Sequence, residues 1–204
     1  MNIHSVVATA TPQTSDKREA ILEAALELFA ERGFHGTAVP TIAERAHVAA
    51  GTIYRYFDSK EALVNALYVR HKSALGATLI SDFPFAGSPR EQFAHFFSRS
   101  IGFAKKHELA FKFLEAHHHA PYLDDESRKV EERTLEPARV FFEVTDRLKI
   151  TKKAQHEALG AIVWGGIVGL VRATWEGRLR LDAKIEAAAE SALWDAIVRH
   201  GDEG

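Results

Sequence analysis

Residues 33–63 read GFHGTAVPTIAERAHVAAGTIYRYFDSKEAL, and this stretch decides the fold. Its apolar residues recur with a helical period that glycine and polar residues interrupt, most clearly at 47–51. Thr37 is placed to cap the first short helix, whose first turn tolerates Pro40 because the amides there have no intrahelical partner. Isolated helices of about two turns are unstable in water. The two short helices of this stretch must therefore pack on a neighbouring helix.

That neighbour precedes the stretch, and we expect it to begin at a cap on Ser15 or Asp16. Gly33 supplies the left-handed residue that ends it. Its apolar residues form one stripe at helical spacing, namely Ile21, Leu22, Ala25, Leu28 and Phe29. A helix, a short helix, a tight turn and a second short helix make a helix-turn-helix, whose last helix enters the major groove of DNA.

The second short helix, expected over residues 50–57, divides its side chains between core and solvent. Ile53 and Phe57 are four residues apart and belong to the core side. Gly51 allows the backbone to approach a duplex closely. The hydroxyl groups of the outward side chains suit phosphates, and the arginine suits a phosphate or a guanine edge. These outward residues are Thr52, Tyr54, Arg55 and Tyr56. The alternative is that the tyrosines only pack and the arginine is solvated.

Residues 16–63 resemble the signature of the TetR family of bacterial regulators. The resemblance rests on Gly33, Phe34, Thr37, Ile42, Ala43, Ala46, Val48 and the runs 51–57 and 59–63. It implies a sequence-specific transcriptional regulator, a repressor by family habit, that a small ligand releases from its operator. It also implies DNA contacts at Thr37, Ala50, Gly51, Thr52, Tyr54, Tyr56 and Lys60, to which the reasoning above adds Arg55. Lys60 and the amides that open the following helix would hold one phosphate, and Asp58 with Glu61 would cap that helix.

Three positions depart from the family pattern. His47 stands where a glycine is usual and can adopt a positive φ only at some cost. Ala49 replaces a serine or threonine cap worth about 1 kcal/mol. Ala50 offers only a methyl contact, for example to thymine. Residues 16–60 hold six Lys or Arg and seven Asp or Glu, so DNA binding must depend on the placement of charge rather than on an excess of it.

The whole chain of 204 residues is predicted to be all-α, with about nine helices. We expect a flexible tail over 1–15, a helix-turn-helix domain over 16–60, and a ligand-binding and dimerisation domain over 61–204. The three helices before residue 60 are expected to be short. Pro137 should kink or divide the stretch 124–148. The chain shows no catalytic signature, so no enzyme activity and no cofactor are predicted.

Phenylalanines dominate the second half of the chain. In the resembling family the helices beyond the third enclose an effector pocket, so we hypothesise a small apolar or aromatic ligand. The residues expected to hold it are Phe96, Phe97, Phe113, His117, Tyr122 and Trp164. The alternative is that these side chains are ordinary core.

Three consecutive histidines, His117 to His119, form a conspicuous cluster. Neighbouring residues of a helix point about 100° apart, so three in a row cannot chelate one metal from a regular helix. No metal site is therefore predicted. Two other functions stay open: an enzyme built on this cluster, and a helical partner-binding protein that has lost DNA binding.

The apolar run 159–171 has 13 uncharged residues, fewer than the about 20 that a membrane span needs. Gly165 and Gly169 lie four apart on one helix face and allow another helix to approach, and the last helix presents Leu193 and Ile197. By the resemblance these two helices pair in a homodimer, which would set two recognition helices against a pseudo-palindromic operator. The alternative is that both are core. With no cysteine and no signal-peptide pattern near the start, we expect a cytoplasmic protein.

Overall fold

The computed structural model describes residues 12–118 and 120–199, with side chains from residue 16 onward. Within these ranges the regular structure is nine α-helices, plus an isolated antiparallel bridge between Thr151 and Val198. The all-α prediction and the approximate helix count are confirmed. Of the predicted tail, residues 1–11 lie outside the described part, whereas residues 12–15 are already helical.

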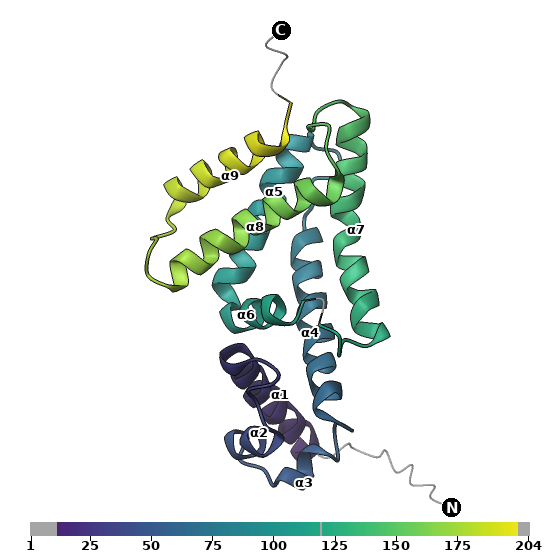
Figure 1. Cartoon of the computed structure of the whole chain (residues 1–204), viewed down its shortest axis with the longest axis vertical. Helices are drawn as coiled ribbons and strands as arrows, with labels where there is room; N and C mark the ends of the chain where they lie inside the picture. Colours follow the sequence, from purple (N-terminus) through teal and green to yellow (C-terminus); the bar gives the residue numbers. More distant parts are fainter. Residues whose placement is uncertain (1–11, 119, 200–204) are drawn as a thin grey trace, which may run out of the picture. The chain divides into compact units, whose positions relative to one another are not determined.

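Figure 1 shows the helices in chain order. They are α1 (Pro12–Arg32), α2 (Val39–Arg45), α3 (Ala50–Ile53), α4 (Lys60–Ile80), α5 (Pro89–Lys106), α6 (Glu108–His117), α7 (Asp125–Arg147), α8 (His156–Trp175) and α9 (Ala183–Ile197). Contacts divide the chain into two compact units. The N-terminal unit holds the described residues up to Tyr68 together with 112–124, and the C-terminal unit holds 69–111 and the described residues from 125 onward. Helices α4 and α6 therefore contribute to both units.

The N-terminal unit is built on α1, whose predicted stripe is at most 2% exposed. Gly33 ends this helix with φ +68, and its amide donates to the Phe29 carbonyl at 3.0 Å, as predicted. The helix begins at Pro12, so the expectation of a cap at Ser15 or Asp16 was wrong, as was the expectation of a short first helix. Proline suits a first helical turn because no intrahelical bond needs its missing N–H.

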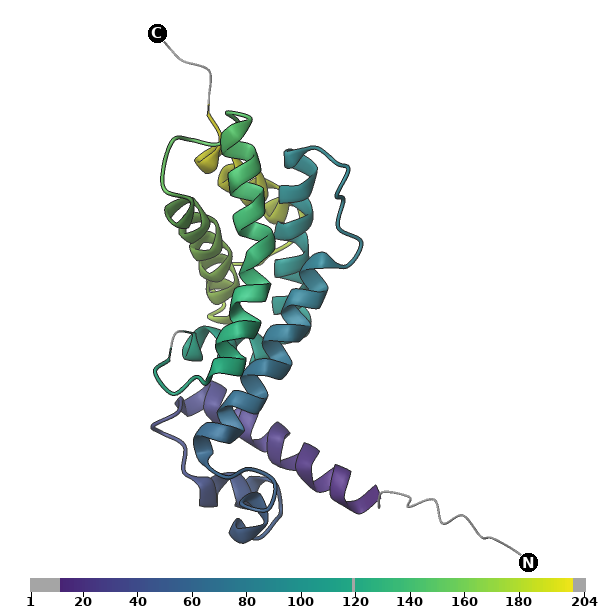
Figure 2. The same ribbon diagram turned by 90° about the vertical axis from the view of Figure 1, so that its right-hand side faces the viewer.

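The C-terminal unit is centred on α8, which packs against α5, α7 and α9. Every fourth residue of α8, from Leu159 through Val171, is buried. Figure 1 shows α8 and α9 side by side, and Figure 2 shows α7 beside the part of α4 that belongs to this unit. Lys72 of α4 pairs with Glu131 of α7 there, with Nζ to Oε1 at 3.7 Å. Pro137 lies inside α7 without dividing it.

Candidate nucleic-acid interface

Two buried side chains anchor the recognition element, by which we mean residues 50–57, in the core of the N-terminal unit. Ile53 and Phe57 are 1% and 5% exposed, which confirms their predicted place in the core. Helix α3 is shorter than expected, because it ends at Ile53 and continues as a turn whose amides at Tyr56 and Phe57 donate to the Ile53 carbonyl. His47 occupies the turn before α3 with φ +54, the positive value predicted for it. Ala49 caps α3 without a side-chain bond.

The side chains between these two anchors face outward to different degrees. Tyr54 is 55% exposed, Arg55 is exposed, and Thr52 and Tyr56 are half-buried. Within the described ranges, no hydrogen bond or ion pair engages the Arg55 side chain, while its backbone amide donates to the Thr52 carbonyl at 3.2 Å. Ala50 and Gly51 are also exposed, and a methyl group on Gly51 would meet nothing within 4 Å. Residues 50–56 therefore expose a guanidinium group, hydroxyl groups and, at Gly51, backbone that no side chain covers.

Thr37 turns inward. It is 2% exposed, and its hydroxyl lies 3.1 Å from the Leu28 carbonyl and 2.9 Å from the Gly33 carbonyl, which share its single O–H hydrogen. Ala38, not Thr37, caps α2, so that expectation was wrong. The side chain of Thr37 thus fixes the end of α1 instead of the start of α2.

The Lys60 side chain contacts the segment that connects α1 to α2. Its Nζ donates to the Phe34 carbonyl at 2.9 Å and to the Thr37 carbonyl at 3.0 Å, and it lies 4.0 Å from the centroid of the Phe34 ring. The side chain is half-buried. An ammonium group carries three N–H donors, so one donor remains beyond these two bonds.

Ser59 caps the start of α4. Its Oγ accepts from the Ala62 amide at 3.1 Å, which is the usual cap-to-N3 bond. The capping box predicted for Asp58 and Glu61 is therefore wrong, because the cap lies one residue later. The Glu61 carboxylate instead accepts from its own backbone amide and from the Ser59 hydroxyl, and both bonds lower its pKa.

Basic side chains on this unit are distributed unevenly. Arg45 is paired with Glu27, with Nη1 to Oε2 at 2.6 Å, and this exposed pair ties α2 to α1. Arg18 lies over the Phe57 ring at 5.2 Å, close to the end of the recognition turn. Arg55 and Lys17 are exposed. This distribution agrees with the prediction that charge here acts by its placement.

His117 belongs to the same unit and is almost fully buried, at 1% exposure. Its Nδ1 lies 2.6 Å from the Tyr122 hydroxyl, and its ring contacts those of Phe29 and Phe113. Burial lowers the pKa of His117 to about 4, and the nearby Phe29 carbonyl opposes this shift without forming a hydrogen bond of ordinary geometry to Nε2. The imidazole is therefore neutral at physiological pH.

The other two histidines of the cluster differ from His117 in what the structure describes of them. His118 is exposed, and His119 lies outside the described residues. Over 16–118 and 120–199, no group of three or more His, Cys, Asp or Glu is arranged to hold a metal ion.

The six predicted ligand residues fall into two groups. Phe113, His117 and Tyr122 belong to the N-terminal unit, and the other three to the C-terminal unit. In the latter, the Phe96 and Trp164 rings lie 6.5 Å apart, while Phe97 is buried in the core. Sequence reasoning did not place Phe111 and Trp175 in this group, although both are aromatic residues at helical spacing. The Phe111 ring lies 5.7 Å from Trp164 and 5.8 Å from Trp175.

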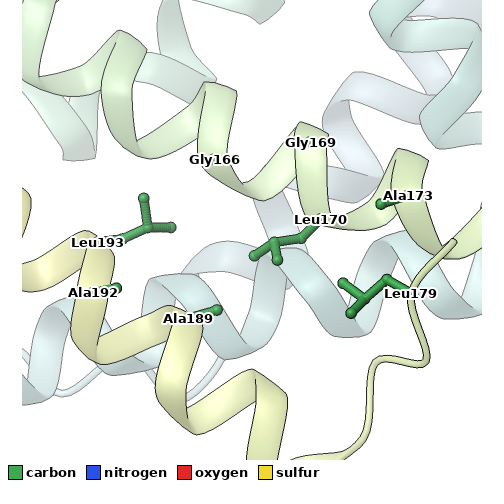
Figure 3. A pocket seen from close by; sticks show the side chains of 8 residues that line it. All are labelled: Gly166, Gly169, Leu170, Ala173, Leu179, Ala189, Ala192 and Leu193. Atoms are coloured by element: carbon green, nitrogen blue, oxygen red, sulfur yellow. The ribbon is translucent and has the colours of Figure 1, made fainter.

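An apolar groove of about 390 Å³ runs between α8 and α9 (Figure 3). It is lined by glycine, alanine and leucine only: Gly166, Gly169, Leu170, Ala173, Leu179, Ala189, Ala192 and Leu193. At Gly166 the two helices are in close contact, because a Cβ there would collide with the end of the Leu193 side chain. Gly165 and Gly169 are exposed, and a Cβ on either would meet nothing within 4 Å, whereas Ile197 is fully buried in the chain.

Among the described helices, only α8 has the length and apolar composition that a membrane span requires. Core helices of soluble proteins also meet this criterion. Only 22% of its most apolar window is buried. Exposed apolar side chains such as Ile162, at 48%, therefore accompany the two exposed glycines on this helix.

Comparisons with known proteins match both parts of the chain. The family model described as bacterial regulatory proteins, tetR family, matches residues 21–67. The model described as tetracyclin repressor-like, C-terminal domain, matches residues 69–199. A TetR family transcription regulator from Marinobacter aquaeolei VT8 has a similar fold, with a TM-score of 0.81 at 21% identity over 92% of this chain and 98% of that one.

Two curated relatives are similar over part of the chain. The chain is 33% identical over 99 residues to the fatty acid metabolism regulator protein of Bacillus subtilis (strain 168), a match over 48% of this chain and 51% of that protein. It is 42% identical over 57 residues to the HTH-type transcriptional repressor KstR2 of Rhodococcus jostii (strain RHA1), over 28% of each chain. The matches thus span 28% to 51% of the length of these relatives. Both relatives are named as regulators, not as enzymes.

Proposed function

The chain belongs to the TetR family of DNA-binding transcriptional regulators, and from that premise we propose that it is a homodimeric repressor released from a pseudo-palindromic operator by a small apolar or aromatic ligand. One observation carries the proposal. The turn after α3 exposes Tyr54 and Arg55 while Ile53 and Phe57 anchor it in the core. Exposed hydroxyl and guanidinium groups on an anchored turn are the groups that bind phosphates and base edges.

Within this proposal the DNA contacts divide by chemistry. Arg55 reads a base edge or binds a phosphate, and the hydroxyl groups of Thr52, Tyr54 and Tyr56 bind phosphates. The exposed backbone at Gly51 allows close approach, and the Ala50 methyl offers an apolar contact. Of the other predicted contacts, Thr37 is buried and its hydroxyl, amide and carbonyl are all hydrogen-bonded, so it supports the interface from within. Lys60 contributes its remaining N–H and its charge.

The proposed dimer face lies on α8 and α9. Gly165 and Gly169 leave one face of α8 open, so a helix of a second copy can approach closely there. Leu193 lines the neighbouring groove, which is of a size to receive apolar side chains from that copy. Ile197 supports the interface from within the protomer, because its side chain has no exposed surface. Dimerisation would cover the apolar surface that α8 exposes and would space two recognition elements for two half-sites.

The ligand is proposed to bind near the aromatic residues of the C-terminal unit. Phe96, Trp164 and Trp175 are half-buried and are joined by ring contacts with one another or with the buried Phe111, an apolar surrounding suited to an apolar or aromatic molecule. Release would follow if the ligand binds more tightly to a conformation that cannot bind DNA, and such couplings typically amount to about 1–3 kcal/mol. Helix α4 starts at Lys60 and continues into the C-terminal unit, so its displacement would reach the DNA contacts. One relative is named as a transcriptional repressor, which supports repression over activation. A DNA-binding regulator of this kind would act in the cytoplasm.

The experiment is a fluorescence-anisotropy titration of the full chain on duplexes that the wild-type protein selects from a random-sequence library, at two salt concentrations. Site-selective binding that weakens steeply with salt supports the proposal. Arg55→Ala should relax selectivity while leaving the melting temperature unchanged. If no duplex is enriched and binding is absent at both salt concentrations, the chain is a partner-binding helical protein instead.

A further inference from the structure

Three side chains of the N-terminal unit form a layered contact, which we call the Phe34 stack: Tyr122, Phe34 and Lys60. The Tyr122 and Phe34 rings lie 4.1 Å apart with planes 23° from parallel. The Lys60 ammonium lies 4.0 Å from the centroid of the same Phe34 ring and donates to the Phe34 carbonyl. One phenylalanine therefore contacts both the proposed phosphate-binding lysine and a tyrosine 62 positions along the chain from that lysine.

Tyr122 is itself fixed at both ends. Its hydroxyl bonds to Nδ1 of the buried His117 at 2.6 Å. Its backbone carbonyl accepts from Asn65 Nδ2 at 2.9 Å, and Asn65 Oδ1 accepts from the Asp124 amide at 2.9 Å. Asn65 is 5% exposed and lies one turn after the start of α4. The residues around Tyr122 are therefore bound directly to the helix that begins at Lys60.

We propose that Tyr122 is a positioning residue for operator binding: by stacking on Phe34 it fixes the surface on which Lys60 rests, and so directs the remaining N–H of Lys60 to a DNA phosphate. The proposal rests on the proposed function, which assigns that phosphate contact to Lys60. Lysine has four rotatable side-chain bonds and loses much rotamer entropy when it is held in one position. A lysine that is already held by two carbonyls and a ring face loses that entropy before DNA arrives, so its contact with a phosphate is stronger.

Phe34 can provide that support only while its own ring is fixed. On one side it meets the Lys60 ammonium, and the attraction between a cation and a ring face depends on the ring staying beneath it. Tyr122 packs against the same ring, and Phe29 lies beside it with centroids 6.3 Å apart. Removing the Tyr122 ring would leave a void beside Phe34 where the two rings now stack, into which Phe34 could rotate.

A double-mutant cycle tests the proposal. The variants are Tyr122→Ala, Tyr122→Phe and Lys60→Met, alone and in combination, each in the full chain. The measured quantities are Kd for the selected operator duplex at several salt concentrations, and the melting temperature of each variant. Tyr122→Phe is the matched control, since it keeps the stacked ring and removes only the hydroxyl.

Tyr122→Ala should weaken binding by about threefold to tenfold and lower the slope of log K against log salt, while Tyr122→Phe should bind within about twofold of wild type. Lys60→Met should lower that slope by about 1.8, one phosphate for each of two protomers. In the Lys60→Met background, Tyr122→Ala should have no further effect on Kd. A residue that matters only for folding would change the melting temperature but would not depend on Lys60 in this way.

Two results would overturn the proposal while leaving the proposed function intact. One is wild-type-like Kd and salt slope for Tyr122→Ala. The other is the same loss of affinity from Tyr122→Ala whether or not Lys60 is present. If the wild-type chain itself shows no salt-dependent operator binding, the proposed function fails first, and this proposal fails with it.

Discussion

Acid should destabilise this protein through His117, whose pKa is about 4 in the folded chain against 6.5 for an ordinary histidine. Above about pH 6.5 both states hold a neutral imidazole, so this residue adds no pH dependence. Between these two values the unfolded chain binds a proton that the folded chain does not, and the free energy of unfolding therefore falls as pH falls. The loss levels off below about pH 4.

The size of the effect follows from the shift in pKa. A difference of about 2.5 pH units corresponds to about 3.4 kcal/mol when fully developed, and to about 2.5 kcal/mol between about pH 7.5 and about pH 4.5. The side chain is 1% exposed, so solvent screens little of this. The groups that face the ring are the Tyr122 hydroxyl, the Phe29 carbonyl and the Phe113 ring, none of which is a carboxylate that could stabilise the charged form.

The assay is urea unfolding at a series of pH values, at one protomer concentration, for wild type, His117→Asn and His118→Asn. Asparagine at position 117 keeps a polar atom near the Tyr122 hydroxyl but does not titrate in this range. Differences in pH slope between variants isolate the histidine, because all other titrating groups are shared. Wild type and His118→Asn should have the same slope, and His117→Asn should have a shallower one. An identical slope for wild type and His117→Asn would refute the account of His117 as a buried neutral group.

Three further predictions concern single side chains. Thr37→Val should lower the free energy of unfolding by about 1–3 kcal/mol in denaturant titrations, because the Leu28 and Gly33 carbonyls lose the O–H donor that they share, while Thr52→Val should change it by less than about 0.5 kcal/mol; equal effects would contradict the contacts described for Thr37. Gly166→Ala should lower the melting temperature because its Cβ collides with the facing leucine, whereas Gly165→Ala should leave the protomer folded and weaken self-association in sedimentation velocity. Arg55→Ala should weaken operator binding with no change in melting temperature: selectivity relaxes if Arg55 reads a base edge, and the salt slope falls by about one per protomer if it binds a phosphate; affinity, selectivity and slope all unchanged would remove Arg55 from the interface.

The helix-turn-helix could be predicted from sequence because its signals are local. A glycine ends α1, an apolar stripe buries it, and Ile53 with Phe57 fixes the side of the recognition turn that faces inward. The capping residues were harder to predict. Thr37 and Asp58 both looked like helix caps, but Ala38 and Ser59 cap instead. A cap depends on which residue takes the β-region backbone, and several candidates one position apart satisfy the same sequence rule.

The predicted number of helices agrees with the number in the described residues partly because two errors in the predicted helix boundaries offset each other. Pro137 was expected to interrupt a helix and lies inside α7. A break at His107, which the sequence did not indicate, separates α5 from α6 with φ −128 and ψ 54. Neither glycine nor proline marks that break, so no local signal was available to predict it.

The contacts of the Phe34 stack could not be predicted from sequence. Tyr122 and His117 were expected among the ligand residues because they are aromatic and lie beyond the helix-turn-helix. Packing instead places both against α1 and the turn that follows it. A pairing between residues 34 and 122 depends on long-range packing, and a single sequence carries no periodic signal for it.

Hydroxyl-radical footprinting of the full chain on its selected operator tests the central claim most directly. A dimeric helix-turn-helix regulator should protect two half-sites related by approximate two-fold symmetry, with centres one helical turn of about 10–10.5 base pairs or a multiple of it apart. Protection in both half-sites should weaken together in Arg55→Ala. A single unsymmetrical protected stretch, or no protection at concentrations that saturate the duplex, would contradict the account.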